Sequence, residues 1–308
     1  MQPRAIETPG ATINVRWGGS GPGLLLLHGF PQTLHMWRDI APLLAAEFTV
    51  VCADLRGYGN SSCPPSAPDH EPYSKRAMAQ DMVSVMEQLG FDRFAVAGHD
   101  RGARVAYRAA LDHPERVDKL AVLDVVAIDA AWSRADDRLA LGFWPWSLLA
   151  QAEPLPERLL AGAPDAVLDQ VLSTEWGTPA DTFDDDARAA YLAPLRDPDH
   201  VHAMCEEYRA AATIDREHDA ADRDAGRRIS CPVLALWSST GPLSTWYADE
   251  GGPLALWREL ADDVTGRPVD GGHFFPEEYP QETAAALAAF FRGITSGRPG
   301  MLGSRERS

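Results

Sequence analysis

A turn around Asp100 carries the clearest chemical signal in the sequence. A short apolar run over residues 94–97 ends in Gly98-x-Asp100-x-Gly102, and a helical pattern follows at once. This spacing is that of a nucleophile elbow, a strained strand-to-helix turn that presents its central side chain above the end of a sheet. Glycines flank the centre because backbone approaches backbone closely there. The presented side chain is a carboxylate, where a serine is usual.

An aspartate at this position predicts a particular class of reaction. Attack on an acyl carbon would form an anhydride and gain little, whereas attack on an epoxide or on a saturated carbon with a leaving group forms an alkyl ester. Water must then cleave that ester at the carbonyl carbon of Asp100, which requires a general base and an oxyanion hole. The alternative is that Asp100 is an ordinary turn residue, since aspartate is common in turns.

Length, charge and cysteine use restrict the class of protein. A chain of 308 residues can form one large domain or a core with an insertion. The formal net charge of −17 argues against nucleic acid or an anionic membrane surface as a partner. The four cysteines are scattered without metal-ligand spacing, which indicates free thiols in a reducing compartment. The N-terminus has no apolar stretch of signal-peptide length and nothing later could span a bilayer, so we expect a cytoplasmic enzyme.

Apolar runs separated by helical patterns predict a parallel sheet. The runs cover residues 24–27, 48–53, 94–97, 120–126 and 233–237. Continuous runs of this kind are typical of strands buried on both faces. A helix is expected from the N-cap Ser74 to Gly90, and the last helix near residues 283–291. The alternation predicts an α/β fold with a doubly wound, mostly parallel sheet.

The pattern changes in the middle of the chain. Residues 129–222 hold helix-length segments broken by prolines, with no convincing buried strand. We predict an inserted all-helical cap over the carboxyl ends of the strands, where such folds bind ligands. The core is then expected in residues 1–128 and 223–295. Residues 296–308 have no periodicity and are expected to be disordered.

A general base and its orienting acid are expected after the elbow. In α/β-hydrolases the nucleophile, the acid and the base follow one another in chain order. Of the nine histidines, His273 alone lies in a loop past the last strand. The loop over residues 238–241 contains no carboxylate, whereas Asp124 directly follows the expected strand residues 120–123, so we assign Asp124 as the acid that holds the imidazole tautomer. The alternative is that Asp124 only caps backbone N–H groups at the strand end.

Two backbone N–H groups are expected to form the oxyanion hole. In α/β-hydrolases a loop headed His-Gly supplies one of them. Here that loop begins at His28, and the N–H would be that of Phe30. The second donor would be the N–H of Arg101, directly after the nucleophile. For the side chain of His28 we favour a purely structural role.

Several motifs together resemble one enzyme family. They cover residues 27–32, 53–59, 98–104, 205–210 and 271–275. On these motifs the chain resembles the haloacetate (fluoroacetate) dehalogenases of the α/β-hydrolase superfamily, over nearly its whole length apart from the tail. Arg101 is discriminating, because haloalkane dehalogenases and epoxide hydrolases usually carry tryptophan at that position. The resemblance implies a homodimer and no cofactor or metal.

Two arginines near the elbow suit an anionic substrate. A haloacetate must bring its carboxylate close to Asp100, and two unit charges about 4 Å apart repel by about 4 kcal/mol at an effective dielectric constant of 20. Arg101 and Arg104 lie three residues apart and would share one face of the elbow helix. A guanidinium binds a carboxylate through paired charge-assisted hydrogen bonds. The alternative is two solvated arginines on an acidic protein.

The resemblance also implies a halide site in the cap. In the family a His-Trp pair and a tyrosine hold the departing halide; Trp146 matches the tryptophan and Tyr208 the tyrosine. Pro145 stands where the family has histidine. Proline donates no hydrogen bond, so this departure weighs against defluorination more than against release of chloride or bromide.

The sequence therefore predicts a cofactor-free hydrolase that converts a 2-haloacetate and water to glycolate and halide. Its small anionic substrate is the expected partner. Two alternatives stay open. An epoxide hydrolase would use the same Asp-His-Asp machinery, and a non-catalytic receptor for a small ligand could share the fold.

Overall fold

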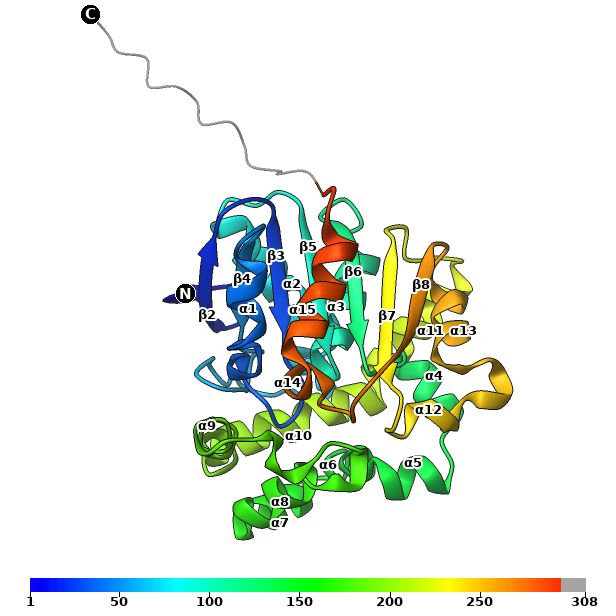
Figure 1. Cartoon of the computed structure of the whole chain (residues 1–308). Coiled ribbons are helices and arrows are strands. Elements are labelled where there is room, and N and C mark those ends of the chain that lie inside the picture. Colours follow the sequence, from blue (N-terminus) through cyan, green and yellow to red (C-terminus); the bar gives the residue numbers. More distant parts are fainter. Residues whose placement is uncertain (295–308) are drawn as a thin grey trace, which may run out of the picture.

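An eight-stranded sheet forms the centre of the computed structural model, which describes residues 1–294 (Figure 1). The strands lie in the order β1-β2-β4-β3-β5-β6-β7-β8. Their bounds are β1 Gln2–Glu7, β2 Thr12–Gly19, β3 Gly23–Leu27, β4 Thr49–Ala53, β5 Phe94–His99, β6 Val117–Leu123, β7 Val233–Ser238 and β8 Val264–Val269. The pairs β1–β2 and β2–β4 are antiparallel, and all other neighbouring pairs are parallel.

Helices cover both faces of this sheet. In Figure 1, α1 (Ile40–Leu44) and α15 (Pro280–Phe291) lie against one face, and α2 (Lys75–Gln88) and α3 (Arg101–Asp112) against the other. Every residue of β3, β4 and β5 is consequently buried, as continuous apolar runs predict. The side chain of Ser74 caps α2 by accepting a hydrogen bond from the N–H of Ala77. The predicted α/β fold with a doubly wound sheet is confirmed.

The chain between β6 and β7 is helical. Its α-helices are α4 Ile128–Ser133, α5 Asp137–Gly142, α6 Trp144–Leu149, α7 Leu155–Gly162, α8 Pro164–Val171, α9 Asp185–Leu195, α10 Pro198–Ala212 and α11 Ile214–Asp224, with short 3₁₀ turns at Thr174–Trp176 and Ala180–Thr182. Figure 1 shows α5 to α10 as a layer across one end of the sheet, the end at which α14 lies. Within the described residues no strand interrupts this segment. The division of the chain at residues 129 and 222 stays a prediction.

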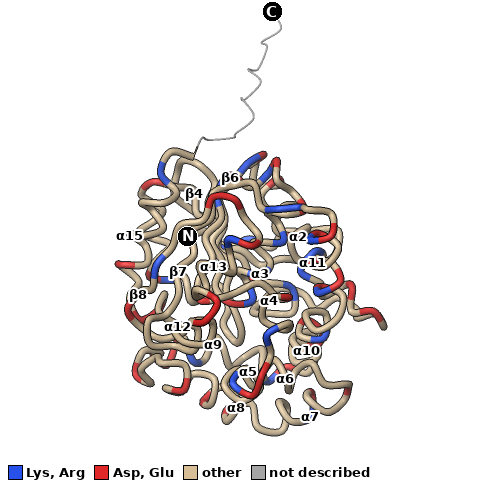
Figure 2. The backbone as a smooth tube through the Cα atoms, turned by 90° about the vertical axis from the view of Figure 1, so that its right-hand side faces the viewer, with Lys and Arg blue, Asp and Glu red and all other residues tan. Residues whose placement is uncertain are grey.

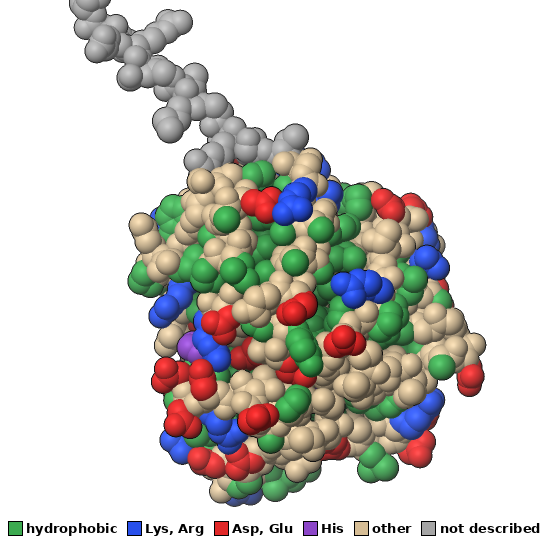
Figure 3. All heavy atoms as spheres, in the orientation of Figure 1, with side chains coloured by type: hydrophobic (Ala, Val, Ile, Leu, Met, Phe, Trp, Pro, Cys, Tyr) green, Lys and Arg blue, Asp and Glu red, His purple; other side chains and the backbone are tan. Residues whose placement is uncertain are grey.

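The remaining elements are short helices and turns in the segments that connect or follow the strands. They are α12 Leu243–Trp246, α13 Gly252–Leu260, α14 Phe275–Glu278, and the 3₁₀ turns Leu34–Trp37, Glu71–Tyr73 and Ala248–Glu250. Acidic and basic residues are spread along the described part of the chain (Figure 2), and both signs are mixed over the face seen in Figure 3. Among residues 1–294 no helix has the length and apolar character needed to cross a membrane. The predicted disordered tail, residues 296–308, lies outside the described residues.

Candidate active site

Asp100 sits in a strained turn between β5 and α3. Its backbone has φ 44° and ψ −114°, a conformation that an L-residue adopts only where the surroundings impose it. A Cβ on Gly98 would lie 2.4 Å from the N of Ala103, and one on Gly102 would lie 2.4 Å from the O of His28. A Cβ on Gly29 would lie 2.6 Å from the Cβ of Asp100. The turn therefore has the geometry of a nucleophile elbow, and it needs glycine at each of these close approaches.

The carboxylate of Asp100 is held by two donors. The N–H of Phe30 donates to Oδ2 at 3.1 Å, and Nη1 of Arg104 donates to Oδ1 at 2.6 Å. Burial alone would raise the pKa of Asp100, but the charges of Arg104 and His273 outweigh burial and hold this pKa below its ordinary value. Asp100 is therefore ionised at neutral pH, as a nucleophile must be.

His273 and Asp124 form a buried pair at the same end of the sheet. Nδ1 of His273 lies 2.6 Å from Oδ2 of Asp124, while Oδ1 of Asp124 accepts a hydrogen bond from the N–H of Ser238 at 2.8 Å. Asp124 thus contacts the imidazole as well as capping a backbone N–H, so capping is not its only contact. The contact assigns the Nδ1–H tautomer and leaves Nε2 of His273 able to accept a proton.

Of the two arginines on the elbow helix, Arg104 faces the cavity and Arg101 does not. Arg104 lines the cavity above Asp100, whereas the side chain of Arg101 is fully buried behind it and is not part of the lining. Glu207 of α10 accepts three hydrogen bonds from Arg101, two from Nε at 2.8 and 2.9 Å and one from Nη2 at 2.6 Å. Glu207 is also paired with Lys75. Within the described residues, Nη1 of Arg101 and Nε of Arg104 are buried polar atoms with no hydrogen-bond partner.

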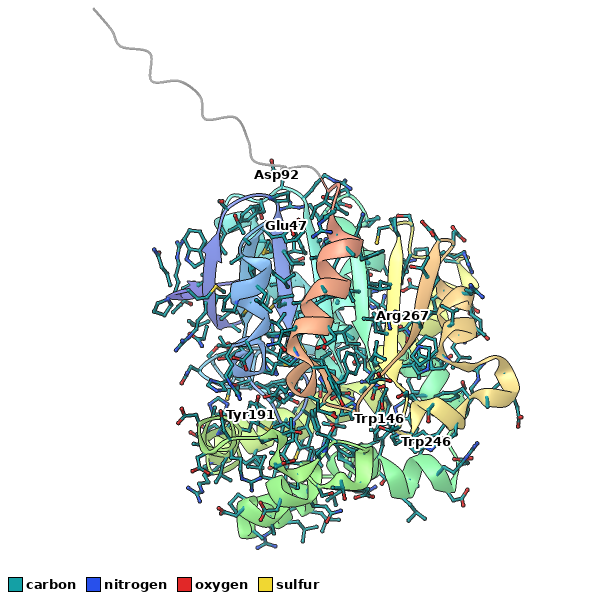
Figure 4. All side chains as sticks on the ribbon, in the orientation of Figure 1. Glu47, Asp92, Trp146, Tyr191, Trp246 and Arg267 are labelled. Carbon is teal, nitrogen blue, oxygen red and sulfur yellow. The ribbon has the colours of Figure 1, made fainter. Side chains whose placement is uncertain are left out.

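The expected halide residues reach the same cavity. Trp146 of α6 and Tyr208 of α10 both line it, together with Pro145. Figure 4 shows Trp146 at the junction between the helical layer and the strand ends. The ring of Trp146 lies 4.5 Å from Cζ of Arg104, and the ring of Tyr208 lies 4.0 Å from Cζ of Arg101. The aromatic rings therefore border both the cavity and the arginines.

The cavity is small and its other walls are mainly apolar. These walls are formed by Phe30, Val125, Val126, Ala131, Leu139, Phe143, Trp176, Leu243 and Tyr247. The space open to the centre of a water molecule is about 20 Å³, little more than the 10–15 Å³ or so that one water requires. A ligand that enters without rearrangement is therefore small.

Sequence reasoning did not find several residues of this site. Glu207 lies in the motif over residues 205–210, but its pairing with Arg101 joins two helices far apart in sequence. Trp176 packs edge-on against His273, with ring centroids 5.3 Å apart, and Tyr247 closes another wall. Aromatic residues in helical segments indicate packing, so their types alone contain no signal for a site. Within residues 1–294 no group of three or more His, Cys, Asp or Glu side chains is placed to hold a metal ion.

Known proteins share this architecture. The sequence profile of the alpha/beta hydrolase fold family matches residues 22–280. A fluoroacetate dehalogenase from Burkholderia sp is 44% identical over 96% of this chain and 95% of that protein, and a soluble epoxide hydrolase from Corynebacterium sp. (strain C12) is 31% identical over 89% and 91%. The crystal structure of an alpha/beta hydrolase from Nostoc sp PCC 7120 superposes with a TM-score of 0.91 at 48% identity, covering 95% of this chain and 98% of that one. With its carboxylate elbow and buried His–Asp pair, this chain belongs to the haloacetate dehalogenase family of the α/β-hydrolase superfamily.

Proposed function

We propose that this protein hydrolyses a 2-haloacetate to glycolate, halide and a proton through an ester on Asp100. As a member of its family the chain is a hydrolase acting on carbon–halogen bonds. One observation carries the assignment of the substrate: Asp100, Arg104 and His273 line the same small cavity. An arginine at the nucleophile suits a substrate that is both small and anionic.

In the first step a carboxylate oxygen of Asp100 attacks the carbon that carries the halogen. The new O–C bond forms as the C–halogen bond breaks, and the halide leaves with the electron pair. Oδ2 already accepts from the N–H of Phe30, so Oδ1 is the nucleophile and Oδ2 becomes the ester carbonyl oxygen. When substrate binds, Arg104 gives up its hydrogen bond to Oδ1 of Asp100 and binds the carboxylate of the substrate instead. Nη1 of Arg101, which has no hydrogen-bond partner among the described residues, lies behind Arg104.

The leaving halide needs hydrogen-bond donors on the opposite side of the carbon. The indole N–H of Trp146 and the hydroxyl of Tyr208 come from two helices that border the cavity. Burial keeps the pKa of Tyr208 well above its ordinary value, so its hydroxyl retains the proton that it must donate. We assign the halide to these two donors.

In the second step water cleaves the ester. His273 takes the proton of the attacking water, and Asp124 stabilises the imidazolium that forms. Negative charge develops on Oδ2 and is received by the N–H groups of Phe30 and Arg101. Collapse of the intermediate breaks the bond between the carbonyl carbon of Asp100 and the ester oxygen, which takes the proton back from His273 and leaves as the hydroxyl of glycolate. The carboxyl group regenerated on Asp100 then releases the product proton and returns to the carboxylate.

A single turnover in heavy-oxygen water tests this order of events. We expect the label to enter the carboxylate of Asp100, because water attacks the ester carbonyl and the first glycolate takes its hydroxyl oxygen from the enzyme. Mass spectrometry of the peptide that contains Asp100, and of the glycolate, measures both. Label found directly in glycolate and absent from Asp100 would overturn the scheme.

Epoxide hydrolysis is the second candidate. The Corynebacterium epoxide hydrolase is 31% identical, and Tyr208 and Tyr247 both line the cavity, where a tyrosine could protonate an epoxide oxygen. Arg104 beside the nucleophile disfavours a neutral epoxide. Halide released from chloroacetate, measured with an ion-selective electrode, separates this function from diol formation. Binding without either product would favour a receptor.

Pro145 is expected to limit defluorination. It lies in the first turn of α6 and lines the cavity next to Trp146, but it offers no donor to fluoride. A charge-assisted hydrogen bond contributes about 1.5–3 kcal/mol, so Pro145→His should raise the fluoroacetate-to-chloroacetate ratio of kcat by roughly 10- to 150-fold. Fluoride and chloride release measure this ratio. Pro164→His, a replacement at the start of α8 outside the cavity lining, is the matched control. An unchanged ratio in Pro145→His would remove Pro145 from the account.

A further inference from the structure

A chain of buried polar side chains runs behind the active site to the loop that carries His273. Nε2 of His99 lies 2.8 Å from the backbone O of His273, and Nδ1 of His99 lies 3.0 Å from Oε1 of Gln32. Nε2 of Gln32 lies 2.5 Å from Oε2 of Glu277. His99 and Gln32 are fully buried, and the side chain of Glu277 is 3% exposed. None of these three side chains lines the cavity.

This chain of hydrogen-bonded side chains ends at the backbone O of His273, the proposed base. The rings of His99 and His273 are 4.6 Å apart between centroids. The N–H of His273 donates to the O of Trp176 at 2.8 Å, so the contact with His99 fixes the other side of the same residue. A shift of His99 would therefore move the imidazole of His273 relative to Asp100.

Hydrogen-bonding rules limit the protonation of this chain. The backbone O of His273 only accepts, so Nε2 of His99 must carry a proton. If Nδ1 carries none, it accepts from the NH₂ of Gln32, since an amide can present either end after a half-turn. The oxygen of Gln32 then faces Glu277, which must be a protonated acid to donate to it. If Nδ1 does carry a proton, His99 is a cation and Glu277 an anion.

Both arrangements contain the same number of protons. Every contact along the chain is satisfied when one proton is shared between His99 and Glu277, and one contact fails when that proton is lost. We infer that Gln32 and Glu277 are positioning residues for His273, and that they hold its loop in place only while their chain with His99 retains this proton. The inference rests on the proposed role of His273 as the base.

The surroundings place the proton on Glu277. Burial, together with the charge of His273, lowers the pKa of His99 to about 3, whereas burial raises the pKa of Glu277 to about 7. The groups that face Glu277 are Tyr191, whose hydroxyl donates to Oε1 at 2.7 Å, and Arg38, whose Nη1 lies 3.4 Å from the same oxygen. Both stabilise the carboxylate and so oppose the effect of burial on this pKa, without outweighing it. Asp184 adds a repulsive charge that favours the neutral acid. Figure 4 shows Tyr191 at the level where the helical layer meets the sheet.

Replacing Gln32 by methionine breaks the chain without changing the length of the side chain greatly. We expect ester formation to keep its rate, because it does not use His273, and ester hydrolysis to slow by about 10- to 100-fold, as a misplacement of about 1 Å can produce. Rapid quench with chloroacetate, followed by intact-mass measurement of the ester on Asp100, separates the two steps. Tyr191→Phe is the control: it removes a donor to Glu277 but leaves the chain intact, and should hydrolyse the ester at the wild-type rate.

Replacing Glu277 by glutamine gives the pH readout. A carboxamide donates to the oxygen of Gln32 at every pH, whereas Glu277 stops donating as the pH rises through about 7. The ratio of the Glu277→Gln hydrolysis rate to the wild-type rate should therefore rise through this pH, and the titration of His273, common to both proteins, cancels. This comparison needs only the isosteric variant, so it stands if Gln32→Met does not fold.

The outcomes separate this inference from the proposed function. A wild-type enzyme that releases no halide, or never carries the ester, overturns the proposed function. If the ester forms but Gln32→Met hydrolyses it at the wild-type rate, or the Glu277→Gln ratio stays constant with pH, the positioning role of the chain is overturned alone.

Discussion

Replacing His273 by asparagine is expected to stop the reaction at the ester on Asp100. Displacement of halide needs only the ionised carboxylate and bound substrate, whereas hydrolysis needs a base held by Asp124 at 2.6 Å. Loss of a general base slows its step by about 10²- to 10⁴-fold. After mixing with chloroacetate, intact-mass spectrometry should show an enzyme that carries one added carboxymethyl group, and peptide mapping should locate it at Asp100.

His113→Asn is the matched control for this experiment. His113 caps the C-terminal end of α3 and does not line the cavity. The control should turn over chloroacetate and accumulate no adduct. A His273→Asn enzyme that releases halide in a burst and yet remains unmodified would contradict the ester mechanism.

Replacing Arg104 by methionine is expected to remove recognition of the substrate's charge. Arg104 is the arginine that lines the cavity, and it contacts Asp100 at 2.6 Å. Charge-assisted hydrogen bonds contribute about 1.5–3 kcal/mol each, so kcat/KM for chloroacetate should fall roughly 10- to 150-fold for each bond lost. Steady-state halide release over a range of chloroacetate concentrations measures this loss.

Chloroacetamide, an uncharged substrate, is the control that separates recognition of the carboxylate from the effect of Arg104 on Asp100. Arg104 also helps to hold the pKa of Asp100 low, and its removal changes the nucleophile equally for both substrates. Chloroacetamide has the same carbon and leaving group but no charge, so its kcat/KM should fall much less. Arg104→Lys keeps a charge without the planar fork and should recover part of the chloroacetate rate. Equal losses for the two substrates in Arg104→Met would show that Arg104 does not read the carboxylate.

The fold was predictable where strands lie in the middle of the sheet. Residues 24–27 and 48–53 are apolar throughout because helices cover both faces of β3 and β4. Neither β1 nor β8 was found. Each lies at an edge of the sheet: β1 buries only Ile6, and β8 buries only Val264 and contains Gly266 and Pro268. An edge strand with one solvated side needs little apolar sequence, so its pattern is weak.

The sequence by itself determined the parts of the site that depend on local chain geometry. The Gly98-x-Asp100-x-Gly102 spacing demands the elbow because no Cβ fits at its glycines. Chain order pointed to Asp124 and His273, and the structure brings them to 2.6 Å. These features follow from single turns and from where parallel strands end.

Only the tertiary structure decided which of the two arginines faces the cavity and which side chains contact the loop of the proposed base, His273. Arg101 and Arg104 share a helix face in sequence, but Glu207 from a distant helix binds Arg101 and leaves Arg104 facing the cavity. The contact between Gln32 and Glu277 likewise joins residues 245 positions apart. Such contacts depend on how the helical layer and the last loop pack on the sheet. A buried charge or amide needs a hydrogen-bond partner, and that partner can come from any part of the chain that packs beside it. The spacing of residues along the sequence therefore does not predict which partner it is.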